Sequence, residues 1–252
     1  LQHDTCRPKE LCRCIALVHG LGDTAATWRH LLQDEATASV PSGIRLVAFD
    51  SAGTNASATP EGYAIPEQAS GLRAALEPLC TRWTVVGNSL GGWTALWLAL
   101  QWPEGVERLL LLAPAGLHDA SGLSESTARI LSDPTAASLR EFNPRVTHRK
   151  RELPDRAFEQ MAAVLRARPV RSTALAVKDE HFLEGRLGEL KIPVTVMWGE
   201  SDGVIPAAQA QAFKREIPHA TVEVIPACGH LPQAECPEPV RRALYQDGRS
   251  QK

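Results

Sequence analysis

The sequence predicts an α/β protein with a mostly parallel sheet of about six strands, flanking helices and one helical insertion. Short apolar runs alternate along the chain with longer amphipathic or alanine-rich segments. The short runs are continuous in Val, Ile and Leu, which is typical of parallel strands buried on both faces. The alternation is interrupted once, between 117 and 190, where helical patches and prolines occur without a convincing strand.

The apolar runs place the individual elements of this sheet. We expect strands at 14–18, 44–49, 84–86, 106–112, 194–197 and 221–225. We expect helices on the two faces at 27–38, 67–79, 90–102, 207–216 and 237–246. About a dozen residues precede the first strong strand, so the sheet should begin with one short strand or none.

The insertion at 117–190 is expected to form a helical lid on a core made of 1–116 and 191–252. Two patches have helical spacing, 124–131 and 155–167. Four prolines interrupt the region: Pro134, Pro144, Pro154 and Pro169. Its apolar side chains predict either a lining for an apolar substrate group or packing against the core. These side chains are Leu131, Phe142, Phe158, Met161 and Leu165.

The composition fits a globular protein and excludes several classes of partner. The chain has 252 residues, is 44% hydrophobic, and balances 27 Lys and Arg against 29 Asp and Glu. This balance provides no field for attracting nucleic acid, and the basic run 148–151 is interpreted as a solvated helix face. No apolar run approaches the roughly 20 residues needed for stable membrane insertion. We expect a cytoplasmic location, or a periplasmic or secreted one if a leader preceded Leu1.

The six cysteines show no paired spacing of a metal site or redox motif, and we expect no metal and no cofactor. A chain of this length does not need disulfides to build a core, so free buried thiols are the first interpretation. A bridge between Cys228 and Cys236 in an oxidising compartment is the alternative.

Ser89 lies in the pentapeptide Gly87-Asn88-Ser89-Leu90-Gly91, which matches G-x-S-x-G. The match alone is weak, but a predicted strand ends directly before it and a predicted helix begins directly after it. A sharp strand-to-helix turn would expose the serine hydroxyl, and only glycines would avoid collisions beside it. Ser89 is therefore the candidate nucleophile.

A serine nucleophile needs a general base and an acidic partner for that base. Among the eight histidines, His230 is preferred because it follows the strand at 221–225, on the carboxyl edge where Ser89 also lies. Asp202 follows the strand at 194–197 on the same edge, and it precedes the histidine in chain order. Glu200 and Asp119 are the rival acids.

The segment His19-Gly20-Leu21-Gly22 follows the first strong strand. Its glycines allow a tight backbone that can direct an N–H group at a carbonyl oxygen. The amides of Leu21 and Leu90 are the candidate oxyanion hole, and Gly20 is a candidate substrate contact. Trp93, Phe142 and Met161 are further candidate substrate contacts, with burial in the core as the alternative for Trp93.

These motifs, taken in order, resemble the α/β-hydrolase superfamily and its serine esterase and lipase-like branch. The resemblance runs from about residue 15 to residue 244 and includes the segment 49–57, which is similar to the D-x-P-G-x-G-x-S loop of that family. Ala52 replaces the usual proline there, and Asn55 replaces the last glycine. The resemblance implies hydrolysis of a small-molecule carboxylic ester by a Ser-His-Asp triad.

The resemblance also implies alternatives. Gly-Asn-Ser-Leu-Gly-Gly is similar to the hydrolases that cleave carbon–carbon bonds in vinylogous diketone acids, although their extended glycine-rich oxyanion loop is missing. Haloperoxidase-like and hydroxynitrile lyase activities are further options, whereas dehalogenases and epoxide hydrolases use an aspartate nucleophile. A non-catalytic ligand receptor on the same fold is the alternative of another class.

Overall fold

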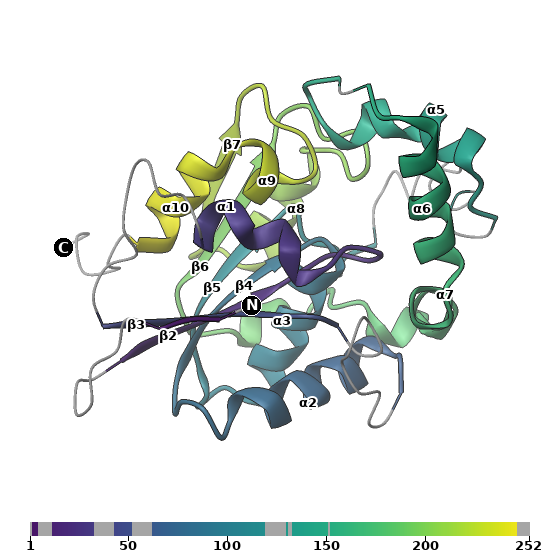
Figure 1. Ribbon diagram of the computed structural model, residues 1–252. Coiled ribbons are helices and arrows are strands. Elements are labelled where there is room, and N and C mark those ends of the chain that lie inside the picture. Colours follow the sequence, from purple (N-terminus) through teal and green to yellow (C-terminus); the bar gives the residue numbers. More distant parts are fainter. Residues whose placement is uncertain are drawn as a thin grey trace.

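The computed structural model describes residues 2–4, 12–32, 43–51, 62–118, 130, 133–150 and 152–245. They form a sheet of order β1-β3-β2-β4-β5-β6-β7, with helices on both faces (Figure 1). The strands are β1 (Gln2–Asp4), β2 (Arg13–Val18), β3 (Ile44–Phe49), β4 (Trp83–Asn88), β5 (Val106–Leu112), β6 (Val194–Gly199) and β7 (Thr221–Ile225). Short β1 pairs antiparallel with β3, and the other strands pair parallel. The six predicted parallel strands are confirmed, and one short strand precedes them.

The helices of the core agree closely with the sequence prediction. They are η1 (Ala25–Trp28), α1 (Arg29–Leu32), α2 (Ile65–Leu76), α3 (Leu90–Gln101), α8 (Gln209–Glu216), α9 (Pro232–Glu235) and α10 (Pro237–Tyr245). Short α9 was not predicted, and residues 33–38 of the first predicted helix lie outside the described residues. No helix in the described ranges is long and apolar enough to cross a membrane.

The predicted insertion, residues 117–190, contains helices and no strand among its described residues. The helices are α5 (Ala136–Val146), α6 (Asp155–Arg166), α7 (Arg168–Ala176), η2 (Asp179–His181) and η3 (Leu187–Glu189). Three of the four prolines predicted as interruptions lie where a helix begins, whereas Pro144 lies inside α5 and does not end it. Pro154 is the N-cap of α6 and Pro169 lies in the first turn of α7, where a missing N–H costs no helical hydrogen bond. Most of the predicted patch 124–131 lies outside the described residues.

Successive strand residues supply two separate cores, one on each face of the sheet. Along β2, Cys14, Ala16 and Val18 pack with apolar residues of α2, α3 and α8. Ile15 and Leu17 face the other way and pack with residues of α1 and α10. Because both faces are covered, the strands carry continuous apolar runs. Figure 1 shows α2 and α3 on one side of the sheet and α1 and α10 on the other.

The parallel register brings the ends of the strands to one edge of the sheet. Val18 of β2 pairs with Gly87 of β4, and Asn88 of β4 pairs with Leu112 of β5. Leu112 pairs in turn with Met197 of β6, and Gly199 pairs with Ile225 of β7. The loops that follow these strands therefore start close together, although they are far apart in the sequence.

The bonding state of the cysteines differs from the first expectation. Cys14 is bonded to Cys80 and Cys228 to Cys236, and the described residues contain no free cysteine. The expectation of free buried thiols is wrong for these four residues. Cys14 and Cys80 are separated by 66 positions, and only the packing of the chain brings their Cα atoms to 6.5 Å. Spacing along the sequence could not indicate that pair.

Candidate active site

Ser89 occupies the sharp turn between β4 and α3, with φ 54° and ψ −119°. A positive φ is strained for a residue with a side chain, so the surrounding contacts must hold it. A Cβ on Gly87 would lie 2.4 Å from the Gly91 carbonyl oxygen, and one on Gly91 would lie 2.2 Å from that of Val18. Both positions therefore exclude any side chain. Ser89 is partly exposed between the buried residues Asn88 and Leu90.

Asp202 and His230 form a buried hydrogen-bonded pair. His230 Nδ1 donates to Asp202 Oδ2 over 2.7 Å, and the two residues are 6% and 7% exposed, respectively. The other carboxylate oxygen accepts from the amides of Val204 and Ile205 at 2.8 and 2.9 Å. The indole of Trp198 donates to Oδ2 over 3.1 Å. Four donors thus satisfy the hydrogen-bonding capacity of the Asp202 carboxylate and hold it in place. The carboxylate in turn holds the Nδ1 side of the His230 imidazole.

Asn88 joins this pair to the turn that carries the serine. Its side-chain amide donates to the carbonyl of His230 over 3.1 Å and to that of Leu112 over 3.0 Å. Its Oδ1 accepts from Gln233 Nε2 over 3.2 Å. Among the described contacts no hydrogen bond joins Ser89 Oγ to His230. The histidine loop is held beside the turn through the residue that precedes the serine.

The segment after β2 lies directly against Ser89. A Cβ on Gly20 would be 3.3 Å from the Cβ of Ser89. His19 shapes the segment because its Nε2 accepts from the Ser51 amide at 2.9 Å, while its Nδ1 donates to the Gly20 carbonyl at 2.7 Å. Within the described part of the chain, the N–H groups of Leu21 and Leu90 make no hydrogen bond. Two backbone donors are thus left available near the serine.

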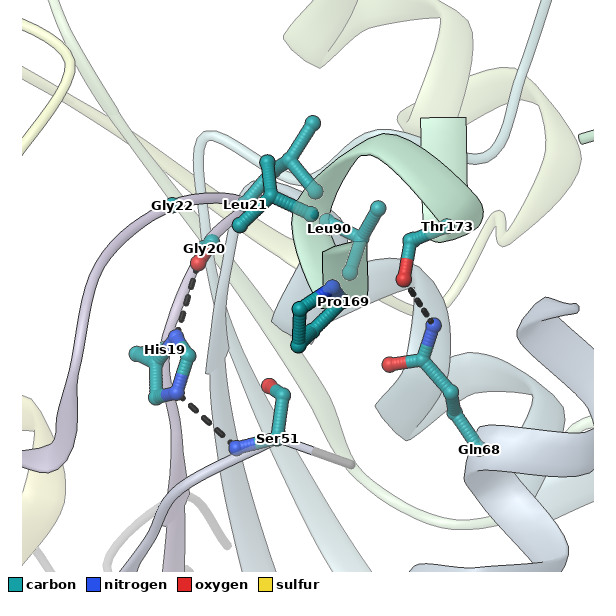
Figure 2. A pocket seen from close by; sticks show the side chains of 10 residues that line it. His19, Gly20, Leu21, Gly22, Ser51, Gln68, Leu90, Pro169 and Thr173 are labelled. Carbon is teal, nitrogen blue, oxygen red and sulfur yellow. Dashed lines mark hydrogen bonds between the residues drawn. The ribbon is translucent and has the colours of Figure 1, made fainter. Parts of the chain in front are cut away.

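A small pocket opens beside these donors (Figure 2). Core residues and residues of α7 line it: His19, Gly20, Leu21, Gly22, Ser51, Gln68, Leu90, Pro169, Val170 and Thr173. Gln68 Nε2 on α2 donates to Thr173 Oγ1 on α7 over 3.3 Å, so core and insertion are joined at the pocket wall. The lining combines aliphatic side chains with amide and hydroxyl groups.

The structure places the four residues predicted as substrate contacts in different surroundings. Gly20 lines the pocket, whereas Trp93, Phe142 and Met161 do not. Trp93 is buried and donates through its indole N–H to the His181 carbonyl over 2.9 Å. Phe142 packs between α5 and α6, and Met161 is 38% exposed. These positions depend on how the insertion packs, which helical spacing does not specify.

Several residues that line the pocket were not predicted from the sequence, although the position of one of them, Ser51, could have indicated it. Ser51 lies two residues after the end of β3, so the rule that selected Ser89 and His230 would also have selected it. Gln68 and Thr173 lie on helices and meet only through tertiary packing. Of the two rival acids, Glu200 accepts through Oε2 from the Ala227 amide over 3.4 Å. Asp119 lies outside the described residues. Most of the segment 49–57 also lies outside them.

One group of possible metal ligands lies close together in the described residues. It consists of Cys228, Glu235 and Cys236. The two sulfur atoms are bonded to each other, so they are not available to a metal in this state. The arrangement at the strand ends, in contrast, has the parts required for nucleophilic chemistry on a carbonyl group.

Comparison with known proteins shows the family to which the chain belongs. The sequence is 27% identical over 252 residues to a putative carbamate hydrolase, RutD, of Cronobacter sakazakii, covering 92% of this chain and 88% of the relative. It is 26% identical over 238 residues to 2-hydroxy-6-oxo-6-phenylhexa-2,4-dienoate hydrolase of Comamonas testosteroni, covering 88% and 82%. A solved structure of Est816, described as an N-acyl homoserine lactone degrading enzyme, has a TM-score of 0.75 and 25% identity, covering 92% of each chain. The alpha/beta hydrolase family model matches residues 15–243, and the chain belongs to that family.

Proposed function

We propose that the protein is a serine hydrolase that cleaves carboxylic esters of small to medium-sized, partly apolar substrates. The observation that carries the proposal is the buried Asp202–His230 pair, with its 2.7 Å hydrogen bond, held beside the strained turn at Ser89. In this assignment Ser89 is the nucleophile, His230 the general base and acid, and Asp202 the group that orients the imidazole.

The assignment leads to a two-step reaction through an acyl-enzyme. Ser89 Oγ attacks the carbonyl carbon while His230 Nε2 takes the hydroxyl proton. The N–H groups of Leu21 and Leu90 donate to the tetrahedral oxyanion. The intermediate collapses, His230 protonates the leaving alkoxide oxygen, and an alcohol departs. Water then attacks the acyl-enzyme with His230 as base, releasing the acid and restoring Ser89.

The pocket supports a substrate of modest size and mixed polarity. Leu21, Leu90 and Val170 provide apolar wall, whereas Gln68 and Thr173 provide polar groups. The insertion at 117–190 acts as a lid in this proposal, because its helix α7 forms part of the wall. Ester cleavage is also supported by the similarity to Est816, since the N-acyl homoserine lactone that Est816 degrades contains a cyclic ester.

Carbon–carbon bond hydrolysis is the second candidate, supported by the similarity to the Comamonas enzyme. Its vinylogous diketone acid substrates carry a carboxylate. The described pocket lining includes no Lys or Arg that would pair with this charge, which favours a neutral ester. Carbamate hydrolysis would use the same residues and is supported by the similarity to RutD. A non-catalytic receptor is the alternative of another class.

A fluorophosphonate probe separates the hydrolases from a receptor. We expect the wild-type protein to become labelled at Ser89 and the Ser89→Ala variant to remain unlabelled, because the probe reacts only with an activated serine. Mass spectrometry of the digested protein locates the label. A folded wild-type protein that stays unlabelled would contradict the serine hydrolase proposal.

Asp202 and Glu200 form a matched pair of carboxylates in one loop. We expect Asp202→Asn to lower kcat for p-nitrophenyl acetate by about 10³- to 10⁴-fold, because the wrong tautomer of His230 is then stabilised. Glu200→Gln should change kcat by less than about twofold, since the one described contact of its carboxylate is with the Ala227 amide. Steady-state kinetics on both variants decides the assignment, and the reverse order of effects would give the orienting role to Glu200.

Val170 should limit the size of the acyl group. We expect Val170→Ala to raise kcat/KM for p-nitrophenyl octanoate relative to the acetate by about tenfold, because it removes two methyl groups from the wall. Val164→Ala on α6 is the control, since Val164 is 42% exposed and does not line the pocket. Equal acyl preferences in wild type and Val170→Ala would show that the acyl group binds elsewhere.

A further inference from the structure

A short segment of the insertion contacts both loops of the proposed triad. Residues 145–149, here called the strap, join the end of α5 to the chain beyond it. The Arg145 carbonyl accepts from the Gly203 amide over 2.9 Å, and the Val146 carbonyl accepts from the His230 amide over 2.7 Å. The imidazole Nδ1 of His148 also lies 2.8 Å from Ser201 Oγ. The strap therefore bridges the Asp202 loop and the His230 loop.

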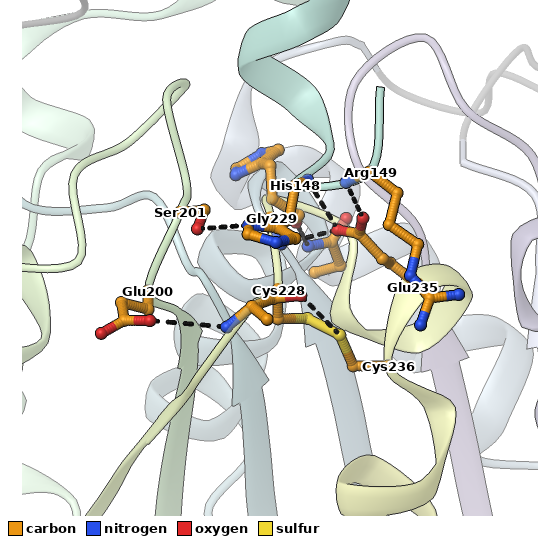
Figure 3. Close-up of a disulfide and its surroundings, with 11 residues drawn as sticks. His148, Arg149, Glu200, Ser201, Cys228, Gly229, Glu235 and Cys236 are labelled. Atoms are coloured by element: carbon orange, nitrogen blue, oxygen red, sulfur yellow. Dashed lines mark hydrogen bonds between the residues drawn. A yellow bond between two sulfur atoms is a disulfide. The ribbon is translucent and has the colours of Figure 1, made fainter. Parts of the chain in front are cut away.

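Glu235 links the strap to the histidine loop through its carboxylate (Figure 3). Its Oε2 accepts from the Gly229 amide at 2.7 Å and from the His148 amide at 3.1 Å. Its Oε1 accepts from the Arg149 amide at 2.8 Å. One side chain thus joins the residue directly before His230 to two consecutive amides of the strap. Hydrogen bonds to an ionised carboxylate are stronger than those between neutral groups.

The fit at this junction leaves the histidine loop little freedom. A Cβ on Gly229 would lie 2.4 Å from the Val146 carbonyl oxygen, 2.7 Å from Thr147 Cα and 2.9 Å from Glu235 Oε2. The backbone of Gly229 is therefore enclosed by the strap and the carboxylate. The disulfide between Cys228 and Cys236 closes the same loop beside Glu235.

We propose that Glu235 is a positioning residue that holds the strap against the histidine loop and thereby sets the place of the His230 imidazole relative to Ser89. This role rests on the proposed serine hydrolase function. Glu235 does not line the pocket, so its loss should leave substrate binding unchanged. It should lower the rate of the chemical step, because displacing a reacting group by about 1 Å can cost about 100-fold in rate.

The experiment compares Glu235→Gln with Glu235→Asp and with Glu238→Gln in the full chain. A glutamine offers only one acceptor oxygen, whereas an aspartate retains two on a shorter side chain. Glu238 lies three residues away and, among the residues that the structure describes, pairs only with Arg241, at 3.5 Å, so its variant is a matched control. For each protein kcat and KM for p-nitrophenyl acetate, the rate of fluorophosphonate labelling, and the thermal unfolding midpoint are measured.

The expected result for Glu235→Gln is a kcat lowered by about 10- to 100-fold, with KM within about twofold and a folded protein. Labelling should slow in parallel, Glu235→Asp should recover part of the loss, and Glu238→Gln should match the wild type. A Glu235→Gln variant with wild-type kcat and labelling overturns the positioning role. An equal loss in Glu235→Gln and Glu235→Asp, accompanied by a large fall in the unfolding midpoint, overturns it in favour of a purely structural role. A wild-type protein that is neither labelled nor active on the ester fails the proposed function instead.

Discussion

The close approach of three backbone segments at Ser89 is the constraint on which the rest of the site depends. The end of β2, the turn and the first residues of α3 lie so near to one another that a Cβ at Gly87 or Gly91 would overlap backbone atoms. Ser89 is held with a positive φ inside this packing. Strain of this kind costs about 1–3 kcal/mol, which the buried strand and helix on either side must offset. The result is a serine at a helix N-terminus, next to the N–H groups of Leu21 and Leu90, which make no hydrogen bond to the described residues.

The proposed acid and base, Asp202 and His230, lie on loops that hydrogen bonds hold at several points. Asp202 is satisfied by four donors from its own loop, from Trp198 and from His230. The histidine loop is anchored by Asn88 on one side and by the strap on another. The predicted insertion therefore contacts the candidate site in two places. Its helix α7 lines the pocket, and the strap contacts the Asp202 and His230 loops.

The sequence predicted those features that depend on local pattern and on chain order. Continuous apolar runs located the parallel strands, and the rule that strand ends share one edge selected Ser89, Asp202 and His230 as a group. The Cys14–Cys80 bridge was beyond such reasoning, because only the folded sheet brings the two residues together. The same holds for Glu235, whose contact with His148 spans 87 positions. The pocket residues of α7 depend on how the insertion packs on the core.

The most direct test of the account is a crystal structure of the protein after reaction with a p-nitrophenyl alkylphosphonate, which imitates the tetrahedral intermediate. The account predicts phosphorus bonded to Ser89 Oγ, with one phosphonyl oxygen about 2.7–3.1 Å from the amides of Leu21 and Leu90 and His230 Nε2 within hydrogen-bond distance of Ser89 Oγ. Phosphorus attached to another residue, or a phosphonyl oxygen directed away from both amides, would contradict it.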